Sequence, residues 1–330
     1  MYHPSFAALL TLGGLAVLVH AAPAPLNSIT ISQVNLVSSD KPTKKADLST
    51  APVTPVYLPI QKPLRFISRW GRDDVKIYER LPVPTTTQRV LIVGDIHGMF
   101  QPFAALIKAM HYNPMTDLLI LLGDLINKGP EPHKVVEHAR KLGAKCVRGN
   151  HEDRFFFERH RRNNDLPIPE KLDLFPETVR QLTEEDITYL AGCSTVIHLT
   201  QSYGPLGEII AVHAGLQVTR SLDAQKADRV LNLPEIIDWS TYDRTFATRL
   251  WQDDWEQAVD PDRPRTVFYG HDDDQGLQIR PHSKGIDTSC FRGNQLTVYE
   301  LPATKLTSVS CAPDSDYSPV VREDETVHFH

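Results

Sequence analysis

The apolar residues of this chain gather into short runs that alternate, from residue 89 onward, with stretches of mixed polarity. Three early runs have the length and composition of buried strands, at 89–94, 118–123 and 144–148. The stretches that follow them have helical spacing, at 100–110, 132–142 and 152–162. Strands and helices in alternation predict a parallel sheet with right-handed crossovers.

The second half of the chain predicts more strands, with fewer helices between them. We expect strands over five further segments, at 194–200, 208–212, 265–269, 286–290 and 295–301. A helix is expected to start near Thr183, because Asp186 three residues later forms a loose capping box with it. Another is expected over 241–258, where Trp251 and Trp255 share one helix face and should pack in the core.

The two ends of the chain lack this alternation. Residues 6–19 form an apolar run with the length of a signal-peptide core, shorter than the roughly 20 residues that span a bilayer. We therefore interpret 1–21 as a signal peptide, or as an uncleaved signal anchor that would associate with a membrane, and predict entry into the secretory pathway. Residues 22–63 are rich in Pro, Ser, Thr and Lys and are predicted to be a flexible linker. The predicted domain covers 64–302, and 303–330 is expected to be a C-terminal tail.

Five of the expected strands end in short strings of glycine and metal-binding residue types. The strings are GDIHG at 94–98, GDLINKG at 123–129, GNHE at 149–152, VHAG at 212–215 and YGH at 269–271. Ligands bind at the carboxyl ends of parallel strands, and glycine lets the backbone turn sharply there. Carboxylate, imidazole and amide donors at one edge suit Zn, Mn, Fe or Mg. One such dipeptide is weak evidence, but five in this context predict a metal centre.

These strings resemble those of the calcineurin-like metallophosphoesterases, in particular the phosphoprotein-phosphatase branch with its GDxHG, GDxxxxG and GNHE blocks. The resemblance covers roughly residues 63–302. Within that branch, the run NKGP at 127–130 looks like that of the bacterial symmetrical diadenosine tetraphosphatases and their eukaryotic relatives, among them a fungal vacuolar zinc-dependent endopolyphosphatase. Protein Ser/Thr phosphatases have Asp-Arg-Gly at this place.

The resemblance implies an α/β fold, an αββα sandwich of two mixed sheets flanked by helices, with a helical insertion over the site within 166–193. It also implies two divalent metal ions, with zinc favoured and Mn, Co, Fe or Mg as alternatives. The ligands carry over to six residues: Asp95 and His97 on one ion, Asp124 between the ions, and Asn150, His213 and His271 on the other. In such centres the ions, about 3.5–4 Å apart, hold a bridging hydroxide that attacks phosphorus in line.

Three further residues match family positions that handle the substrate. His151 corresponds to the leaving-group acid, but the residue matching its usual carboxylate partner is the neutral Asn127, which we expect to accept a hydrogen bond from it. A neutral partner stabilises the imidazolium less, which suits a leaving group that is itself a phosphate chain. Lys128 and Arg148 are the expected phosphate-binding residues.

Composition and charge narrow the range of partners. The 330 residues are 41% hydrophobic, enough for one sizeable core, and the net charge of -6 argues against holding nucleic acid duplexes through a general positive field. A polyanionic phosphate substrate must therefore be bound by positive charges that are local to the site. Three arginines near the end of the 152–162 helix form either a patch for such a polyanion or, in the interpretation we favour, the ordinary cationic end of a helix: Arg159, Arg161 and Arg162. Glu158 is expected to pair with Arg154. No protein partner is predictable.

The four cysteines predict no zinc knuckle, because no two of them are spaced as CxxC. A disulfide is permitted in a secretory compartment, but the sequence does not determine its pairing. Cys146 and Cys290 lie in expected strands, where we predict small buried apolar residues.

Together these features predict a metal-dependent phosphoric anhydride hydrolase. The leading interpretation is an endo-acting polyphosphatase of a vacuole-like compartment, in its lumen or at its membrane, with secretion as the alternative location. The alternative substrates are dinucleoside polyphosphates and, after them, phosphoproteins. A binding protein without catalysis is disfavoured, because all six ligand positions and His151 are present.

Overall fold

The computed structural model describes residues 7–12, 15–21, 31–37, 75–166, 180–232 and 250–326. Contacts divide the chain into two units, Met1–Lys62 and Pro63–His330. The first contains an antiparallel sheet of three strands, β1 (Ala7–Leu12), β2 (Leu15–Ala21) and β3 (Ile31–Val37). The predicted linker therefore includes a strand, because the apolar and β-branched residues of β3 pair with β2. The targeting role of the first segment stays a prediction.

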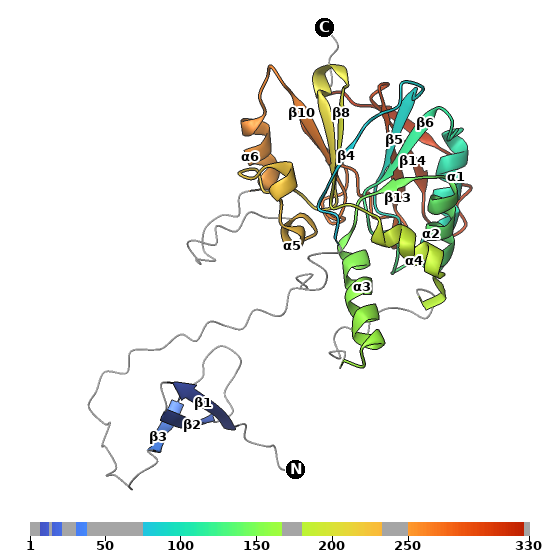
Figure 1. The fold of residues 1–330 in the computed structure, drawn as a ribbon. Helices are drawn as coiled ribbons and strands as arrows, with labels where there is room; N and C mark the ends of the chain where they lie inside the picture. Colours follow the sequence, from blue (N-terminus) through green and yellow to red (C-terminus); the bar gives the residue numbers. More distant parts are fainter. Residues whose placement is uncertain are drawn as a thin grey trace. The chain divides into compact units, whose positions relative to one another are not determined.

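The second unit contains a six-stranded mixed sheet that carries the first three metal-binding strings (Figure 1). Its parallel part consists of β5 (Arg89–Val93), β6 (Asp117–Leu121) and β7 (Lys145–Cys146). Two helices connect these strands, α1 (Phe100–Ala109) and α2 (Pro132–Lys141). Its antiparallel part consists of β13 (Gln295–Leu301), β14 (Lys305–Ser310) and β15 (Val320–Glu323). Because β13 pairs with β5, the strand order is β15-β14-β13-β5-β6-β7.

Strands β14 and β15 correct the expected boundary of the domain at residue 302. The sequence predicts a tail there, whereas Leu306 and Val309 of β14 are buried on opposite faces of the sheet. Asp324, just after β15, is buried and forms an ion pair of 2.7 Å with Lys284 of the other sheet. The packed domain therefore extends to the last described residues of the chain.

A second six-stranded mixed sheet carries the other two strings. In spatial order its strands are β11 (Gln278–Ile279), β12 (Ser283–Gly285), β10 (Arg265–Tyr269), β9 (Glu208–Val212), β8 (Val196–Ser202) and β4 (Tyr78–Leu81). β9 and β10 run parallel. Their carboxyl ends, and with them the VHAG and YGH strings, therefore lie at the same edge of this sheet.

Two sheets with helices on their outer faces form the layers of the domain (Figure 1), and buried apolar clusters lie between these layers. Between the sheets, Ile92 of β5 packs in one cluster with Phe268 of β10. On the other face of the first sheet, Leu91 packs with Phe103 of α1, and the outer face of the second sheet packs against Trp251. Both faces of the central strands are buried, which is why those strands are continuous apolar runs in the sequence. The predicted αββα sandwich is confirmed.

The described residues of this unit form four more α-helices: α3 (Asn150–Asn163), α4 (Glu184–Ala191), α5 (Ala227–Val230) and α6 (Trp251–Ala258). Trp251 and Trp255 of α6 are buried, which confirms their expected place in the core. The start of the predicted 241–258 helix lies outside the described residues. No helix in the described part of the chain combines the length and apolar character needed to cross a membrane.

The predicted start of α4 is confirmed, but its predicted position over the site is not. Asp186 N donates to Thr183 Oγ1 at 3.2 Å, which caps the helix. Arg140 of α2 donates to Asp186 Oδ1 at 2.9 Å, and α4 packs against α2. This helix therefore extends the helical layer beside the first sheet. The preceding residues 167–179 lie outside the described residues.

The strand expected over 286–290 is absent from this described segment. β12 ends at Gly285, and Ser289 has a φ of 56°, which interrupts extended backbone before a short 3-10 helix, Cys290–Arg292. Ile286 and Cys290, the apolar residues of the segment, are buried but belong to no strand. The prediction of a strand here is therefore wrong.

All four cysteines form disulfides, which corrects the prediction that Cys146 and Cys290 are simple buried apolar residues. Cys146 pairs with Cys193 and Cys290 with Cys311, at Cα separations of 4.9 and 5.2 Å. The first bond links β7 to the residue that follows the α4 C-cap. The second links the 3-10 helix to the end of β14. The sequence permits disulfides but does not show these pairings, because each partner is distant along the chain.

Candidate metal centre

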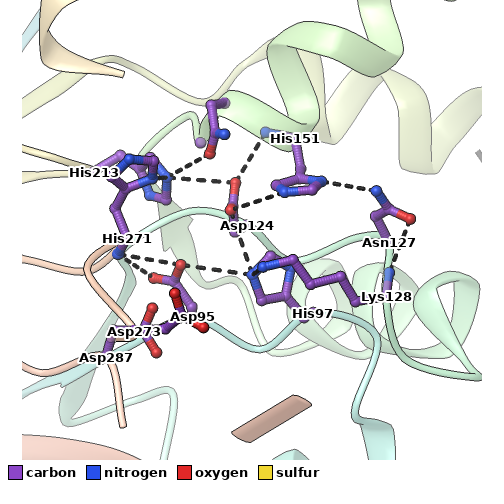
Figure 2. Close-up of polar contacts among 12 residues, drawn as sticks. Asp95, His97, Asp124, Asn127, Lys128, His151, His213, His271, Asp273 and Asp287 are labelled. Atoms are coloured by element: carbon purple, nitrogen blue, oxygen red, sulfur yellow. Dashed lines mark hydrogen bonds and ion pairs between the residues drawn. The ribbon is translucent and has the colours of Figure 1, made fainter. Parts of the chain in front are cut away.

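Side chains from five strand ends converge at one edge of the sandwich (Figure 2). They are Asp95 and His97 after β5, Asp124 after β6, Asn150 after β7, His213 after β9 and His271 after β10. These are the six residues named from the sequence as ligands. Four of them are almost completely buried: Asp95, His97, Asp124 and His213. Each sheet contributes ligands, so the centre lies where the two sheets meet.

The backbone at this centre adopts a conformation that most side chains avoid. His97, Asp124 and His271 have φ values of 48°, 48° and 69°, in the left-handed region. Two glycines allow close approach: a Cβ on Gly270 would lie 1.9 Å from Asp95 Oδ1, and one on Gly149 would lie 2.1 Å from Asp124 Oδ1. Backbone strain of this kind costs about 1–3 kcal/mol per residue and concentrates at functional sites.

Asp124 occupies the middle of the cluster. Its Oδ2 lies 3.5 Å from His97 Nε2 and 3.7 Å from His151 Nε2, while its Oδ1 lies 3.5 Å from His213 Nε2. The donor atoms form two groups that could each hold a cation, His97–Asp124–His151 and Asp124–His213–His271. Asp124 belongs to both groups, the arrangement expected of a bridging carboxylate. Asp95 adjoins the first group, with its Oδ2 3.8 Å from His97 Nε2.

Backbone carbonyls orient two of the imidazole rings. His213 Nδ1 lies 2.8 Å from Leu122 O, and His97 Nδ1 lies 3.3 Å from Ile126 O. Each Nδ1–H therefore donates to a carbonyl, which leaves the Nε2 lone pair directed at Asp124. Metal-binding histidines are oriented in this way by their second nitrogen.

Several side-chain nitrogen and oxygen atoms that can donate lone pairs face one another around His213 Nε2. Asn150 Oδ1 lies 2.9 Å from His213 Nε2, and His271 Nδ1 lies 3.2 Å from the same Nε2. Turning the Asn150 amide would place its nitrogen 2.9 Å from His213 Nε2 and 3.0 Å from Asp124 Oδ2, as a donor to both. With its oxygen inward, Asn150 completes a set of lone pairs that a cation can bind.

The electrostatics of the cluster also fit cations. Burial and the neighbouring carboxylates Asp287 and Asp124 raise the pKa of Asp95, and burial raises the pKa of Asp124 to about 6. Burial lowers the pKa of His213 and of His271 to about 3, so both imidazoles are neutral and able to ligate at pH 7. Buried carboxylates without cations are costly, and two divalent ions would satisfy them. The residues present therefore fit a two-metal centre.

His151 is oriented by Asn127 in the opposite sense from that predicted. The backbone N–H of Lys128 donates to Asn127 Oδ1 at 2.9 Å, which turns the Asn127 amide nitrogen toward His151 Nδ1 at 2.8 Å. Asn127 therefore donates to His151 rather than accepting from it. The His151 proton resides on Nε2, which faces Asp124 across 3.7 Å. Burial and the positive charges of Lys128 and Arg154 lower the pKa of His151 to about 3.

Lys128 reaches the centre from its solvent-exposed rim. Its Nζ donates to His97 Nε2 at 2.9 Å (Figure 2). The ammonium and a metal ion would use the same lone pair, so metal binding leaves Lys128 without this acceptor. The predicted role of Lys128 in phosphate binding is compatible with this position.

Arg148 and the predicted arginine patch have other described contacts. Arg148 Nε lies 3.4 Å from Asp153 Oδ1, and its guanidinium lies over the Phe156 ring at 4.5 Å. Its predicted phosphate contact stays a prediction. Of the three patch arginines, Arg159 pairs with Glu184 at 2.9 Å and Arg162 pairs with Glu158 at 2.6 Å. Glu158 pairs with Arg162, and both ion pairs weaken the patch interpretation. The pairing of Glu158 with Arg154 stays a prediction.

The sequence interpretation misses two residues that contact the centre. Glu152 is fully buried and accepts four backbone N–H groups, from Asp124, Leu125, Ile126 and Gly149, at 2.8–3.2 Å. Its place in the GNHE string is the signal that could have identified it. Phe291 packs edge-on against the His97 ring, with centroids 5.1 Å apart. It lies outside every string, and no pattern in the sequence marks it.

The fold and the centre together define a metal-dependent phosphohydrolase of the two-metal type. Residues 88–297 match the calcineurin-like phosphoesterases, and the chain belongs to this family. The resemblance seen in the five strings is thereby confirmed.

Relatives within the family include enzymes of polyphosphate and of dinucleotides. The chain is 28% identical over 250 residues to the zinc-dependent endopolyphosphatase of Saccharomyces cerevisiae, covering 65% of this chain and 76% of that protein. It is 26% identical over 251 residues to the asymmetrical bis(5'-nucleosyl)-tetraphosphatase PrpE of Bacillus velezensis, covering 71% of this chain and 96% of that protein. A crystal structure of a proposed diadenosine tetraphosphatase superposes with a TM-score of 0.58 at 28% identity, over 73% of this chain and 100% of that chain.

Proposed function

We propose that this protein hydrolyses phosphoanhydride bonds and that its substrate is inorganic polyphosphate, cut at internal bonds with zinc as the preferred metal. The observation that carries the proposal is the hydrogen bond from Asn127 to His151. A donor at His151 Nδ1 disfavours the imidazolium, so His151 is poorly suited to protonate the alkoxide leaving group of a phosphoester. A phosphate chain needs little protonation as it leaves.

The residues of the chain have defined tasks in this proposal. The six ligands would hold two divalent ions, with Asp124 shared between them. When bound, such a pair activates water and neutralises phosphoryl charge. His151 offers its Nε2–H as a neutral hydrogen-bond donor to the departing oxygen. Lys128, exposed at the rim, binds a phosphate oxygen of the chain as a point charge.

Two relatives support the choice of an anhydride substrate and differ on its identity. The endopolyphosphatase match favours inorganic polyphosphate. The tetraphosphatase match favours a dinucleoside polyphosphate, our second candidate, because it covers 96% of that relative. Protein phosphatase activity is the third candidate, and the Asn127–His151 hydrogen bond disfavours it.

A substrate panel tests this proposal. Long-chain polyphosphate, diadenosine tetraphosphate and a phosphoserine peptide would each be assayed with Zn, Mn, Co and Mg. The expected result is the highest kcat/KM for polyphosphate, with shorter chains rather than orthophosphate as the first products. Preference for the dinucleotide would move the assignment to the second candidate. Preference for the peptide would overturn the anhydride assignment.

We also propose that the first segment directs the protein into the secretory pathway, toward a vacuole lumen or membrane or out of the cell. The support is the apolar run over 6–19, which has the length of a signal-peptide core. Fractionation of cells that express the full chain, followed by protease protection, tests the location. A protease-accessible cytosolic protein would refute it.

A further inference from the structure

The ammonium of Lys128 lies over the face of an aromatic ring. Lys128 Nζ is 3.8 Å from the centroid of Phe291, well within the range of a cation–π interaction. The same ring meets His97 edge-on, with 76° between the two ring planes. Phe291 therefore contacts both the metal ligand His97 and the cation at the rim of the centre.

Lys128 differs from the other cationic side chains around the site in the groups that it contacts. Within the described part of the chain, no carboxylate oxygen lies within the ion-pair distance of its Nζ, whose described partners are His97 Nε2 and the Phe291 ring. Arg148 lies beside Asp153, and Arg292 is paired with Asp273 at 2.7 Å. An aromatic face holds a cation without neutralising it, so the charge of Lys128 stays available for an anion.

The loop that carries Phe291 is anchored on both sides. Cys290, the preceding residue, is bonded to Cys311. Arg292, the following residue, pairs with Asp273, and Ser289 Oγ donates to Asp273 O at 2.6 Å. The two contacts with Asp273 attach the loop to the segment that follows His271. The position of the Phe291 ring is thus determined by the fold and not by Lys128.

We propose that Phe291 is a positioning residue that holds the Lys128 ammonium at the rim of the centre for a non-bridging phosphate oxygen of the substrate. The inference rests on the proposed function in taking phosphate as the ligand, but it does not depend on whether the substrate is polyphosphate or a dinucleotide. A metal ion that binds His97 Nε2 removes the hydrogen-bonded partner of Lys128. The Phe291 ring then remains to keep the ammonium from dispersing into solvent, which lowers the entropy cost of binding the anion.

The test compares Phe291→Leu, which keeps an apolar side chain but removes the π face, with Phe291→Tyr, which retains the face. For Phe291→Leu we expect KM for tripolyphosphate and Ki for orthophosphate to rise about two- to fivefold, the range of an exposed cation–π contact, with kcat unchanged. Phe291→Tyr should restore wild-type values. Orthophosphate is measured as an inhibitor of p-nitrophenyl phosphate hydrolysis, so this arm is independent of the natural substrate.

A double-mutant cycle with Lys128→Met shows whether Phe291 affects phosphate binding through Lys128. In that background Phe291→Leu should cause no further change in the orthophosphate Ki. Metal titration by calorimetry should give two equivalents with wild-type affinity for Phe291→Leu. Phe100→Leu is the matched control, because Phe100 lies under Lys134 at 5.8 Å, and it should leave Ki unchanged.

Two outcomes would overturn the inference. One is an equal effect of Phe291→Leu with and without Lys128, and the other is a loss of metal affinity that accounts for the change in Ki, since Phe291 would then act through His97. If the wild-type protein does not hydrolyse polyphosphate but the cycle behaves as expected, the substrate proposal fails while the role of Phe291 stands.

Discussion

The backbone N–H of Asp124 donates a hydrogen bond of 2.8 Å to Glu152 Oε2. The same oxygen accepts from Gly149 N at 2.9 Å, so one buried carboxylate ties the loop after β6 to the start of α3. The other oxygen, Oε1, accepts from Leu125 N and Ile126 N at 2.9 and 3.2 Å. Asp124 is the residue shared by both donor groups, so Glu152 holds the centre in place through the backbone of Asp124.

Replacing Glu152 by Gln should therefore damage both stability and metal binding. An amide NH2 would face two backbone N–H groups, whichever way it turned, and would leave them buried without an acceptor. We expect a loss of at least about 2 kcal/mol of unfolding free energy. Metal affinity should fall by about 10–100-fold, as it does when partners of metal ligands are lost. Thermal unfolding and zinc titration measure the two effects.

Glu184→Gln is the matched control for this prediction, because the Glu184 side chain is 80% exposed in its pair with Arg159. It should change stability by less than about 1 kcal/mol. A Glu152→Gln protein with normal stability and normal metal affinity would show that the four hydrogen bonds do not organise the centre.

Metal affinity should depend on pH through the carboxylates rather than the imidazoles. Burial raises the pKa of Asp124 to about 6, while it lowers the pKa of His213 and of His271 to about 3. As pH falls through 6, Asp124 takes up a proton that a metal must displace, so affinity should fall. The imidazoles are already neutral there and should contribute little down to about pH 4.

Zinc titration at pH 7.5 and at pH 5.5, in buffers of different ionisation enthalpy, measures the protons released. More protons should be released on binding at the lower pH. Asp124→Asn should abolish the pH effect together with at least one metal equivalent. Proton release that follows an ordinary histidine titration, without a contribution near pH 6 from Asp124, would contradict the assignment.

The Asn127–His151 hydrogen bond predicts how leaving-group preference can be changed. In Asn127→Asp, the introduced carboxylate would accept from His151 Nδ1–H and raise the pKa of His151, since an adjacent negative charge favours the imidazolium. General acid catalysis should then help substrates with poor leaving groups. We expect the ratio of phosphopeptide to polyphosphate turnover to rise by at least about tenfold.

Asn113→Asp provides the matched control, since Asn113 Oδ1 accepts from Met115 N at 3.0 Å in a turn that contributes nothing to the centre. It should leave the ratio unchanged. If Asn127→Asp leaves the ratio unchanged as well, the neutral partner of His151 does not set substrate preference, and the anhydride argument loses its main support.

The C-terminal strands predict that a substitution far from the metal centre will cause a large loss of stability. Lys284 and Asp324 have no exposed side-chain surface, and Tyr299 donates to Asp324 at 2.7 Å. Asp324→Asn would leave the Lys284 charge buried without its counter-ion, at a cost of about 3–5 kcal/mol of unfolding free energy. Denaturant unfolding measures this loss. Glu323→Gln, in an exposed pair with Lys305, should cost less than about 1 kcal/mol, and equal losses in both would refute the prediction.

The same pair predicts a stability change in acid. Although burial opposes ionisation, hydrogen bonds from Lys284, Thr326 and Tyr299 lower the pKa of Asp324. A lowered folded-state pKa contributes stability above the unfolded value of about 3.9, and this contribution is lost as pH falls through the folded value. The wild type should therefore lose more stability than Asp324→Asn below about pH 4.

The sequence predicts which side chains converge, because the candidate ligands follow apolar runs that end at one edge. Asp95, Asp124 and His213 each come directly after such a run, and parallel strands bring their ends together. The rest of the site depends on contacts that have no local pattern. Glu152 acts through backbone N–H groups that come from two separate segments, and the Asn127 amide is turned by the backbone of Lys128.

The errors in the fold have a similar origin. Residues 286–290 are mostly buried and include the apolar Ile286 and Cys290, but Ser289 adopts positive φ and ends the extended backbone. Residues 303–330 are less apolar than the central strands, and their place in the sheet depends on pairing with β13 and on the Lys284–Asp324 ion pair. Such pairings join distant parts of the chain, and no periodicity within a window shows them.

The pairing of β5 with β13 has a consequence for biosynthesis. Val93 pairs with Val298, so a central strand is synthesised long before the neighbouring strand that covers its edge. The nascent chain therefore carries β5 and β6 with an open edge while most of the domain is being synthesised, and such edges invite aggregation. His271, too, is translated late. The candidate metal centre can thus assemble only after both sheets have contributed their strands.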